Sequence, residues 1–310
     1  MSRRNILLLR ITVGGVLALS TFPALGQTVD STPNTPQLVR EAYRNGVTMS
    51  RRIYQYSWTD TRSYRVVEKG GKVKTYPEQV YEVFPNRVSG RFLLRQLVKE
   101  NGVPLSPERF AKEQARLAKE IEKDDRDAEK AELKAAEKKS PPVTPDDGCL
   151  PEGYVTSYGA NGGLIAFGIS DFLCAGEFSN PRRGAVNGRE ATILDFRPRA
   201  DYVPPNKERK PITGLHGSIW IDDADRVVSR LEAWPGLERD DRNTKEIQKE
   251  LVLVYEQLRL ADGTWMHAST RINTTNHPKL FNGVTIEFQE VFTNYKRFSS
   301  EVDSYKIGKP

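Results

Sequence analysis

The chain has 310 residues, of which 37% are hydrophobic, and its 47 basic and 41 acidic side chains give a net charge of +6. The apolar fraction is sufficient for a folded core, and the charge excess is too small to predict nucleic-acid binding. A chain of this length fits one large β domain or two smaller domains.

The first residues are typical of a secretory signal peptide. Arg3, Arg4 and Arg10 give a basic start, an apolar stretch follows, and small residues end at Gly26. We therefore expect cleavage after Gly26 and an exported chain of residues 27–310, with a net charge of +3 and no spanning segment. An uncleaved membrane anchor is the alternative, which the short and interrupted apolar stretch disfavours.

A predominantly β pattern follows. Helical spacing predicts a short helix over residues 36–44, ended by Gly46, and antiparallel strands after it. The last three strands are long, and the Asp262-Gly263 step predicts a hairpin turn between two of them. The predicted strands cover residues 52–67, 73–84, 91–98, 164–168, 190–196, 218–221, 227–233, 249–260, 264–275 and 284–298.

A densely charged segment interrupts the strands. Ser106 and Pro107 are typical of a helix start, and residues 108–139 contain ten basic and ten acidic side chains, with opposite charges often four apart. A thin apolar stripe is confined to the first half, so we expect the second half to be solvated; a partner-binding arm is the alternative. Residues 106–148 are thus a predicted helical insertion and linker within a single domain.

Cys149 and Cys174 are the two cysteines of the chain. In an exported protein such a pair indicates a disulfide more often than two free thiols. They have no histidine neighbours at a zinc-site spacing and do not form a C-x-x-C motif, so we expect neither a metal site nor a redox site there.

The sequence offers no positive case for catalysis. An Asp-Asp-Ala-Asp stretch at 222–225 is typical of a tight turn, with a cation site as the alternative. Nucleophile-elbow, phosphate-loop and paired His–Glu motifs are absent from the sequence. We therefore predict no enzyme, no metal and no cofactor. The three histidines are scattered and show no metal-ligand spacing: His216, His267 and His277.

Three stretches resemble the outer-membrane lipoprotein-sorting (LolA/LolB-like) carriers: GSIWID with RVVSRL at 217–231, FTNYKRF at 292–298, and the hairpin at 64–81. The resemblance implies a mainly β (α+β) fold, a strongly curved and unclosed antiparallel barrel or sheet with covering helices, and a periplasmic location. It places the 217–231 hairpin in the middle of that sheet. The chain is longer than typical carriers, and Gln27 stands where receptor members have a lipid-attachment Cys, which favours a soluble carrier.

The resemblance also implies a non-enzymatic carrier that binds a lipid or a lipoprotein acyl chain on the concave face, because a one-layer curved sheet needs apolar cover. One alternative is an envelope regulatory or scaffold protein that binds a protein partner through the same fold and the charged helix. Another is a hydrolase acting through acids such as Asp222 or Glu287. The candidate cavity residues are Tyr54, Tyr56, Trp58, Trp220, Val252, Tyr255 and Trp265.

Overall fold

The computed structural model describes residues 34–68, 70–85, 93–137, 168–236, 251–275 and 285–298. The predicted signal peptide, residues 1–26, lies outside the described residues. Within the described ranges, no helix is both long enough and apolar enough to span a membrane.

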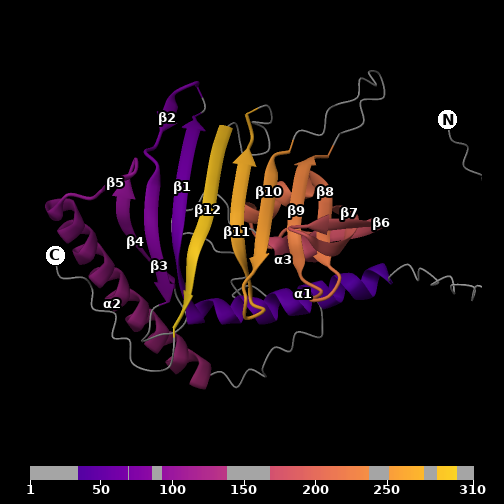
Figure 1. The fold of residues 1–310 in the computed structure, drawn as a ribbon, viewed down its shortest axis with the longest axis horizontal. Coiled ribbons are helices and arrows are strands. Elements are labelled where there is room, and N and C mark those ends of the chain that lie inside the picture. The colour runs from indigo at the N-terminus through magenta and orange to yellow at the C-terminus, as the bar shows by residue number, and fades with distance from the viewer. Residues whose placement is uncertain are drawn as a thin grey trace, which may run out of the picture. The chain divides into compact units, whose positions relative to one another are not determined.

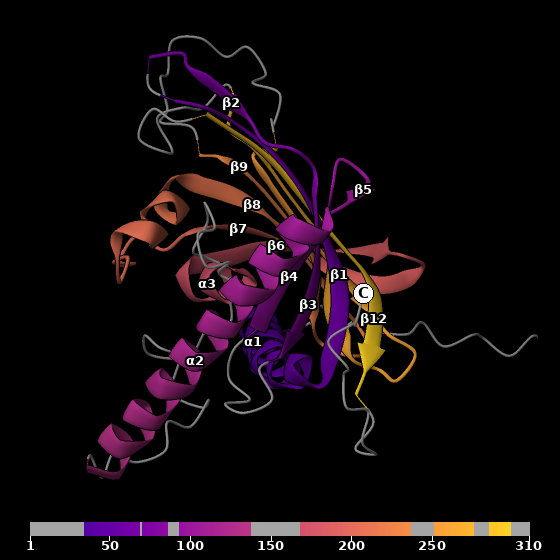
Figure 2. The ribbon, with the colours of Figure 1, turned by 90° about the vertical axis from the view of Figure 1, so that its left-hand side faces the viewer.

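Twelve strands form one antiparallel sheet (Figure 1). The strands are β1 (Tyr56–Val67), β2 (Val73–Thr75), β3 (Gln79–Pro85), β4 (Leu93–Glu100), β5 (Val103–Pro104), β6 (Gly176–Val186), β7 (Arg189–Pro198), β8 (Leu215–Asp222), β9 (Val228–Pro235), β10 (Leu253–Arg259), β11 (Trp265–Asn273) and β12 (Thr285–Arg297). Their order is β5-β4-β3-β1-β12-β11-β10-β9-β8-β7-β6, and β2 pairs with the end of β1. Because the two ends of this order are not paired with each other, the sheet is open, and Figure 2 shows that it is strongly curved. The predicted fold class is confirmed.

Pairing between β1 and β12 joins two meanders that are distant in sequence. Strands β1 to β5 follow one another on one side, and β6 to β12 follow one another on the other side. The two strands run antiparallel from the Tyr56–Arg297 pair to the Val67–Thr285 pair, with one register shift after Ser57. This seam is the longest strand pairing of the described sheet.

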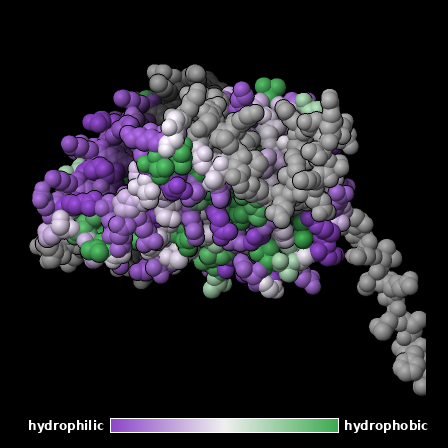
Figure 3. All heavy atoms as spheres, turned by 90° about the horizontal axis from the view of Figure 1, so that it is seen from above, coloured by the Kyte–Doolittle hydropathy of each residue, from purple (hydrophilic) through white to green (hydrophobic). Residues whose placement is uncertain are grey.

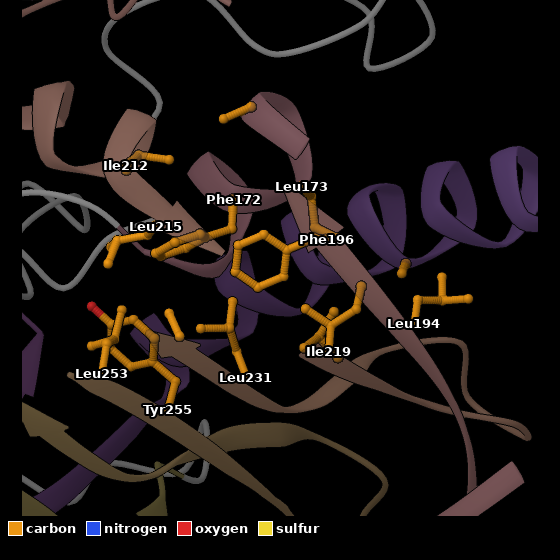
Figure 4. Packing of buried hydrophobic residues seen from close by; sticks show 14 of the residues in the cluster. Phe172, Leu173, Leu194, Phe196, Ile212, Leu215, Ile219, Leu231, Leu253 and Tyr255 are labelled. Atoms are coloured by element: carbon orange, nitrogen blue, oxygen red, sulfur yellow. The ribbon is translucent and has the colours of Figure 1, made fainter. Parts of the chain in front are cut away.

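Helices cover one face of the sheet, here named the inner face. The helices α1 (Thr35–Arg52) and α3 (Ile169–Ala175) lie on its concave side (Figure 2). The 3-10 helices η1 (Ile53–Gln55) and η3 (Lys207–Gly214) contribute the buried residues Ile53 and Ile212 to the hydrophobic packing. Side chains of β7 to β12 alternate across the sheet, so every second residue enters a common core with α1 and α3. Figure 4 shows part of this core, in which Phe172, Leu194, Ile219 and Leu231 have no exposed surface.

Helix α1 is longer than predicted, because it continues through Gly46 to Arg52. The Asn34 side chain accepts a hydrogen bond from the Gln37 amide at 3.2 Å and caps the first turn. Buried Leu38, Ala42 and Val47 form the apolar stripe that faces the core, and this stripe extends past the glycine. The predicted end at Gly46 was therefore wrong.

The charged insertion forms the helix α2 (Pro107–Glu137), which packs against β4. The Leu97 amide donates to the Glu113 carboxylate at 2.9 Å, and Arg116 donates to the Arg95 carbonyl at 2.5 Å. These side chains use backbone groups on the edge of β4, which would otherwise be open to another strand. Hydrophilic residues dominate the left-hand side of Figure 3, where α2 and β2 to β5 lie. The predicted linker after residue 137 lies outside the described residues.

Two further expectations need correction. The hairpin of β8 and β9 is interior but lies toward the β6 edge, whereas β11 and β12 are central. Pro77 has no amide hydrogen for a ladder, and the predicted strand over 73–84 is divided around it into β2 and β3. Of the predicted strand over 164–168 only Gly168 is described, and residues 164–167 lie outside the described residues. The helix α3 and the edge strand β6 were not predicted.

Two glycines provide a matched test of this packing. A Cβ added at Gly46 meets no atom within 4 Å, so Gly46→Ala should raise the free energy of unfolding by about 0.5–1 kcal/mol. A Cβ at Gly217 would lie 2.1 Å from the Glu232 carbonyl oxygen and 2.3 Å from the Phe196 ring. Gly217→Ala should therefore cost about 1–3 kcal/mol. Urea unfolding followed by circular dichroism measures both; a destabilised Gly46→Ala would contradict the continuous α1.

Candidate functional site

A cavity of about 60 Å³ lies between α1 and the inner face of the sheet. Helix α1 forms one wall, α3 contributes to a second, and residues of β9 to β11 close the third. The lining includes two methionines, whose flexible side chains can adapt to ligands of varied shape. With α1 in this position the cavity is smaller than most ligand sites, which measure about 300–1,000 Å³. The main apolar side chains of its lining are Tyr43, Val47, Met49, Leu173, Trp265 and Met266.

His267 connects this cavity to an aromatic run along the inner face. Its ring lies edge-on to Tyr255, with centroids 5.7 Å apart, and to Phe292, at 5.3 Å. The Tyr295 hydroxyl donates to the His267 carbonyl at 2.5 Å, and the Tyr295 ring lies 5.8 Å from Trp58. Burial lowers the pKa of His267 to about 4, against the attraction of Glu290, so its imidazole is neutral at pH 7.

Four charged side chains follow this aromatic run and are here named the polar cluster: Asp60 and Arg62 of β1, Arg95 of β4, and Glu290 of β12. Arg62 donates to Glu290 through Nε at 2.7 Å and lies 2.6 Å from it through Nη2. Its Nε also lies 3.0 Å from Asp60 Oδ2. Arg95 Nη1 is farther from both acids, 3.4 Å from Asp60 and 3.6 Å from Glu290. Three strands thus bring two acids and two arginines together.

Within the polar cluster, Asp60 is fully buried and its hydrogen bonding is incomplete. Neither carboxylate oxygen of Asp60, nor Arg95 Nη1, makes a hydrogen bond of normal geometry to a described residue. Burial, and then the negative charge of Glu290, raise the pKa of Asp60 to about 8, in opposition to Arg62. At pH 7 the Asp60 carboxyl is therefore mostly protonated, so the polar cluster holds at most one negative charge beside two guanidinium groups.

Sequence reasoning missed the polar cluster, although part of the signal was present. Alternation along β1 places Asp60 and Arg62 on the same face as Tyr56 and Trp58, and charged residues on a core face are unusual. The partners on β4 and β12 could not be found in this way. Their positions depend on the register of strands more than 30 and more than 220 residues away along the chain.

Most predicted cavity residues lie on the inner side of the sheet. Tyr56 and Trp58 are buried in an aromatic cluster with Phe292 and Met266, against which Tyr54 packs. Val252 and Tyr255 belong to the core beneath α1 and α3, and Trp265 lines the cavity.

Trp220 lies on the opposite face of the sheet from its neighbours Ile219 and Ile221, which enter the core. The Arg230 guanidinium lies 5.7 Å from the centre of its ring. We therefore leave Trp220 out of the candidate site. Cys174 lies in α3, whereas Cys149 is outside the described residues, so their disulfide remains a prediction.

The aspartates at 222–225 act as turn residues held by arginines. Asp222 accepts two hydrogen bonds from Arg189, at 2.6 and 2.9 Å, and others from the turn amides. Burial raises the pKa of Asp222, but these hydrogen bonds outweigh burial and hold it below its usual range. Among the described residues no three His, Cys, Asp or Glu side chains could hold a metal ion. Glu287, the other acid of the hydrolase alternative, is 40% exposed and pairs with Arg65; His277 is outside the described residues.

The chain matches no protein-family model and no curated protein sequence. It is similar to solved structures of lipoprotein-sorting and LolA superfamily proteins. An outer membrane lipoprotein-sorting protein domain from Vibrio parahaemolyticus has 10% identity and a TM-score of 0.33, covering 86% of this chain and 95% of that one. A LolA superfamily protein from Nitrosomonas europaea has 8% identity and a TM-score of 0.30, covering 83% and 94%.

A DUF1329 family protein from Desulfovibrio piger is also similar, with 13% identity and a TM-score of 0.32 over 86% of this chain and 96% of that one. The lipoprotein-sorting proteins to which the sequence shows a resemblance are thus also found among these structures.

The buried Asp60 carboxyl predicts a distinctive pH dependence of stability. Its pKa is raised in the folded protein, so the folded state holds a proton that the unfolded state releases above about pH 4. The free energy of unfolding should therefore fall as the pH rises toward 8. Burial raises the pKa values of Tyr81 and Tyr295 and lowers that of His267, so these neighbours titrate outside pH 5–8.

Asp60→Asn removes this titration and should gain stability over the wild type by about 2–4 kcal/mol between pH 5 and pH 8. Urea unfolding at several pH values measures the difference. Asp195→Asn is the matched control, because the Asp195 pKa is lowered: burial raises it, but bonds from Ser218 and Arg182 outweigh burial. An equal gain in both variants would contradict the assignment.

Proposed function

We propose that this protein is a non-enzymatic periplasmic carrier that holds an acyl chain of a lipid or lipoprotein between α1 and the inner face of the sheet. The observation that carries this proposal is the apolar cavity that α1 closes against β9 to β11. Of the predicted cavity residues, Tyr54, Tyr56, Trp58, Val252, Tyr255 and Trp265 remain in the proposed site.

Helix α1 has the properties of a displaceable cover. Its three buried apolar side chains, Leu38, Ala42 and Val47, contribute roughly 4–6 kcal/mol of apolar burial. An acyl chain gains about 0.8 kcal/mol for each buried CH₂ group. Since partly buried residues of α1 add to its attachment, a chain of roughly ten methylene groups is needed to offset the loss of α1 contacts.

The sheet would keep its own packing when α1 moves. Most of the core beneath α1 consists of side chains from β7 to β12, joined by strand pairing and closed further by Phe172 of α3 and Ile212 of η3. The lining of the cavity includes Met49 and Met266, which can adapt to a chain of variable length. A bound chain would thus enlarge the existing cavity rather than require a new one.

Native mass spectrometry of protein purified from an envelope extract, with lipid extraction of the same sample, tests the proposal. We expect a stoichiometric acylated species to accompany the protein. A ligand-free mass that does not change after incubation with lipids and lipopeptides would refute the carrier function.

Two variants of α1 test whether the ligand lies in the cavity. Gly46 lines the cavity, and its missing side chain leaves open space, so Gly46→Leu should fill part of it and reduce the bound fraction at least about threefold. Thr48→Leu places the same side chain on the exposed side of the same helix, where the Thr48 hydroxyl donates to the Arg44 carbonyl. Equal lipid loading of the two variants, measured by native mass spectrometry, would place the ligand elsewhere.

A further inference from the structure

The polar cluster lies where the head of a ligand on the inner face would be. In the sheet register Asp60 is directly opposite Phe292, and Arg62 is opposite Glu290. Phe292 also contacts His267, which lines the cavity. From the cavity, the inner face therefore continues through the rings of His267 and Phe292 to the charged side chains of β1 and β12.

From this arrangement we infer that the polar cluster binds the anionic head group, a carboxylate or a phosphate, of the amphiphile whose chain occupies the cavity. The inference rests on the proposed carrier function and specifies the class of its ligand. An uncharged amphiphile of equal chain length would gain only the apolar contacts.

Arg95 is the residue best placed to donate hydrogen bonds to a bound anion. Arg62 is engaged by Glu290 through two nitrogens, whereas Arg95 Nη1 is buried and makes no hydrogen bond of normal geometry to any residue of the described ranges. Buried polar atoms nearly always have a partner, so this nitrogen indicates a polar group that completes the cluster. The Arg62 and Arg95 side chains are 14% and 15% exposed, which leaves them within reach of a ligand.

The charge balance of the polar cluster also favours an anion. Asp60 has no exposed surface and a raised pKa, so it contributes little negative charge near pH 7. The two guanidinium groups are then opposed by Glu290 alone, and a bound anion would restore neutrality. A guanidinium presents parallel N–H donors in one plane, which match the oxygens of a carboxylate or a phosphate.

Calorimetric titration of the delipidated protein with three amphiphiles of one chain length tests this inference. Laurate, dodecyl phosphate and dodecanol share the dodecyl-length chain and differ at the head. We expect at least one of the two anions to bind about tenfold more tightly than dodecanol. The tighter anion identifies the head group as a carboxylate or as a phosphate.

Three variants test whether the polar cluster causes the preference for an anionic head group. Arg95→Gln should remove most of the preference for the anion, while Arg65→Gln should retain it, because Arg65 lies on β1 at the other face and pairs with Glu287. Asp60→Asn should retain or increase the preference, since it leaves both arginines and removes an acid. This variant also keeps the inference testable if Arg95→Gln does not fold.

The outcomes separate the two proposals. Equal affinity for all three amphiphiles, or an anion preference that survives in Arg95→Gln, would overturn the head-group assignment and leave the carrier function in place; the cluster would then be a structural ion network only. A clearly weaker anion preference in Asp60→Asn would overturn it as well. If none of the three amphiphiles binds, the carrier function and the head-group assignment fail together.

Discussion

The pairing of β1 with β12 is the constraint on which the rest of the structure depends. It joins two runs of strands through two members that are separated by more than 200 residues, and it does so along almost the whole length of both strands. Each run alone would be a meander with an additional open edge. Their union gives one sheet wide enough to curve around α1 and α3, so the inner face exists only because this seam forms.

The seam also explains where charge is tolerated on the inner face. The core beneath α1 and α3 is apolar, and none of the four residues of the polar cluster belongs to it. There, Arg62 crosses the seam to Glu290, and Arg95 reaches the same acids from β4. Buried ions of this kind stabilise a fold weakly, because desolvation offsets their attraction. A cluster at such a costly place is therefore better explained by recognition than by stability.

The sequence predicted the features that are set by local physics. The long closing strands, the start of α2 at Ser106 and the turn at 222–225 follow from alternation, capping and turn propensity. The failures can be traced to particular residues. A glycine often ends a helix, yet burial of Val47, the residue after Gly46, maintains α1. The edge strand β6 was missed because Pro181, Arg182 and Arg183 give it the composition of a loop, which also protects an open edge.

The candidate site could not be predicted from the sequence for a different reason. Strand register and alternation decide which side chains meet on the inner face. Trp220 and Trp265 have similar local signals, and an arginine lies over each ring, but Trp220 is on the outer side of the sheet and Trp265 lines the cavity. Arg62 and Arg65 are three residues apart on one strand, and the alternation of β1 gives them opposite faces. A carrier ligand bound along the inner face would contact both halves of the sheet at once. Its chain would displace α1 from β9 to β11 while its head contacted Arg95 of β4, so the ligand would extend across the β1–β12 seam that lies between them.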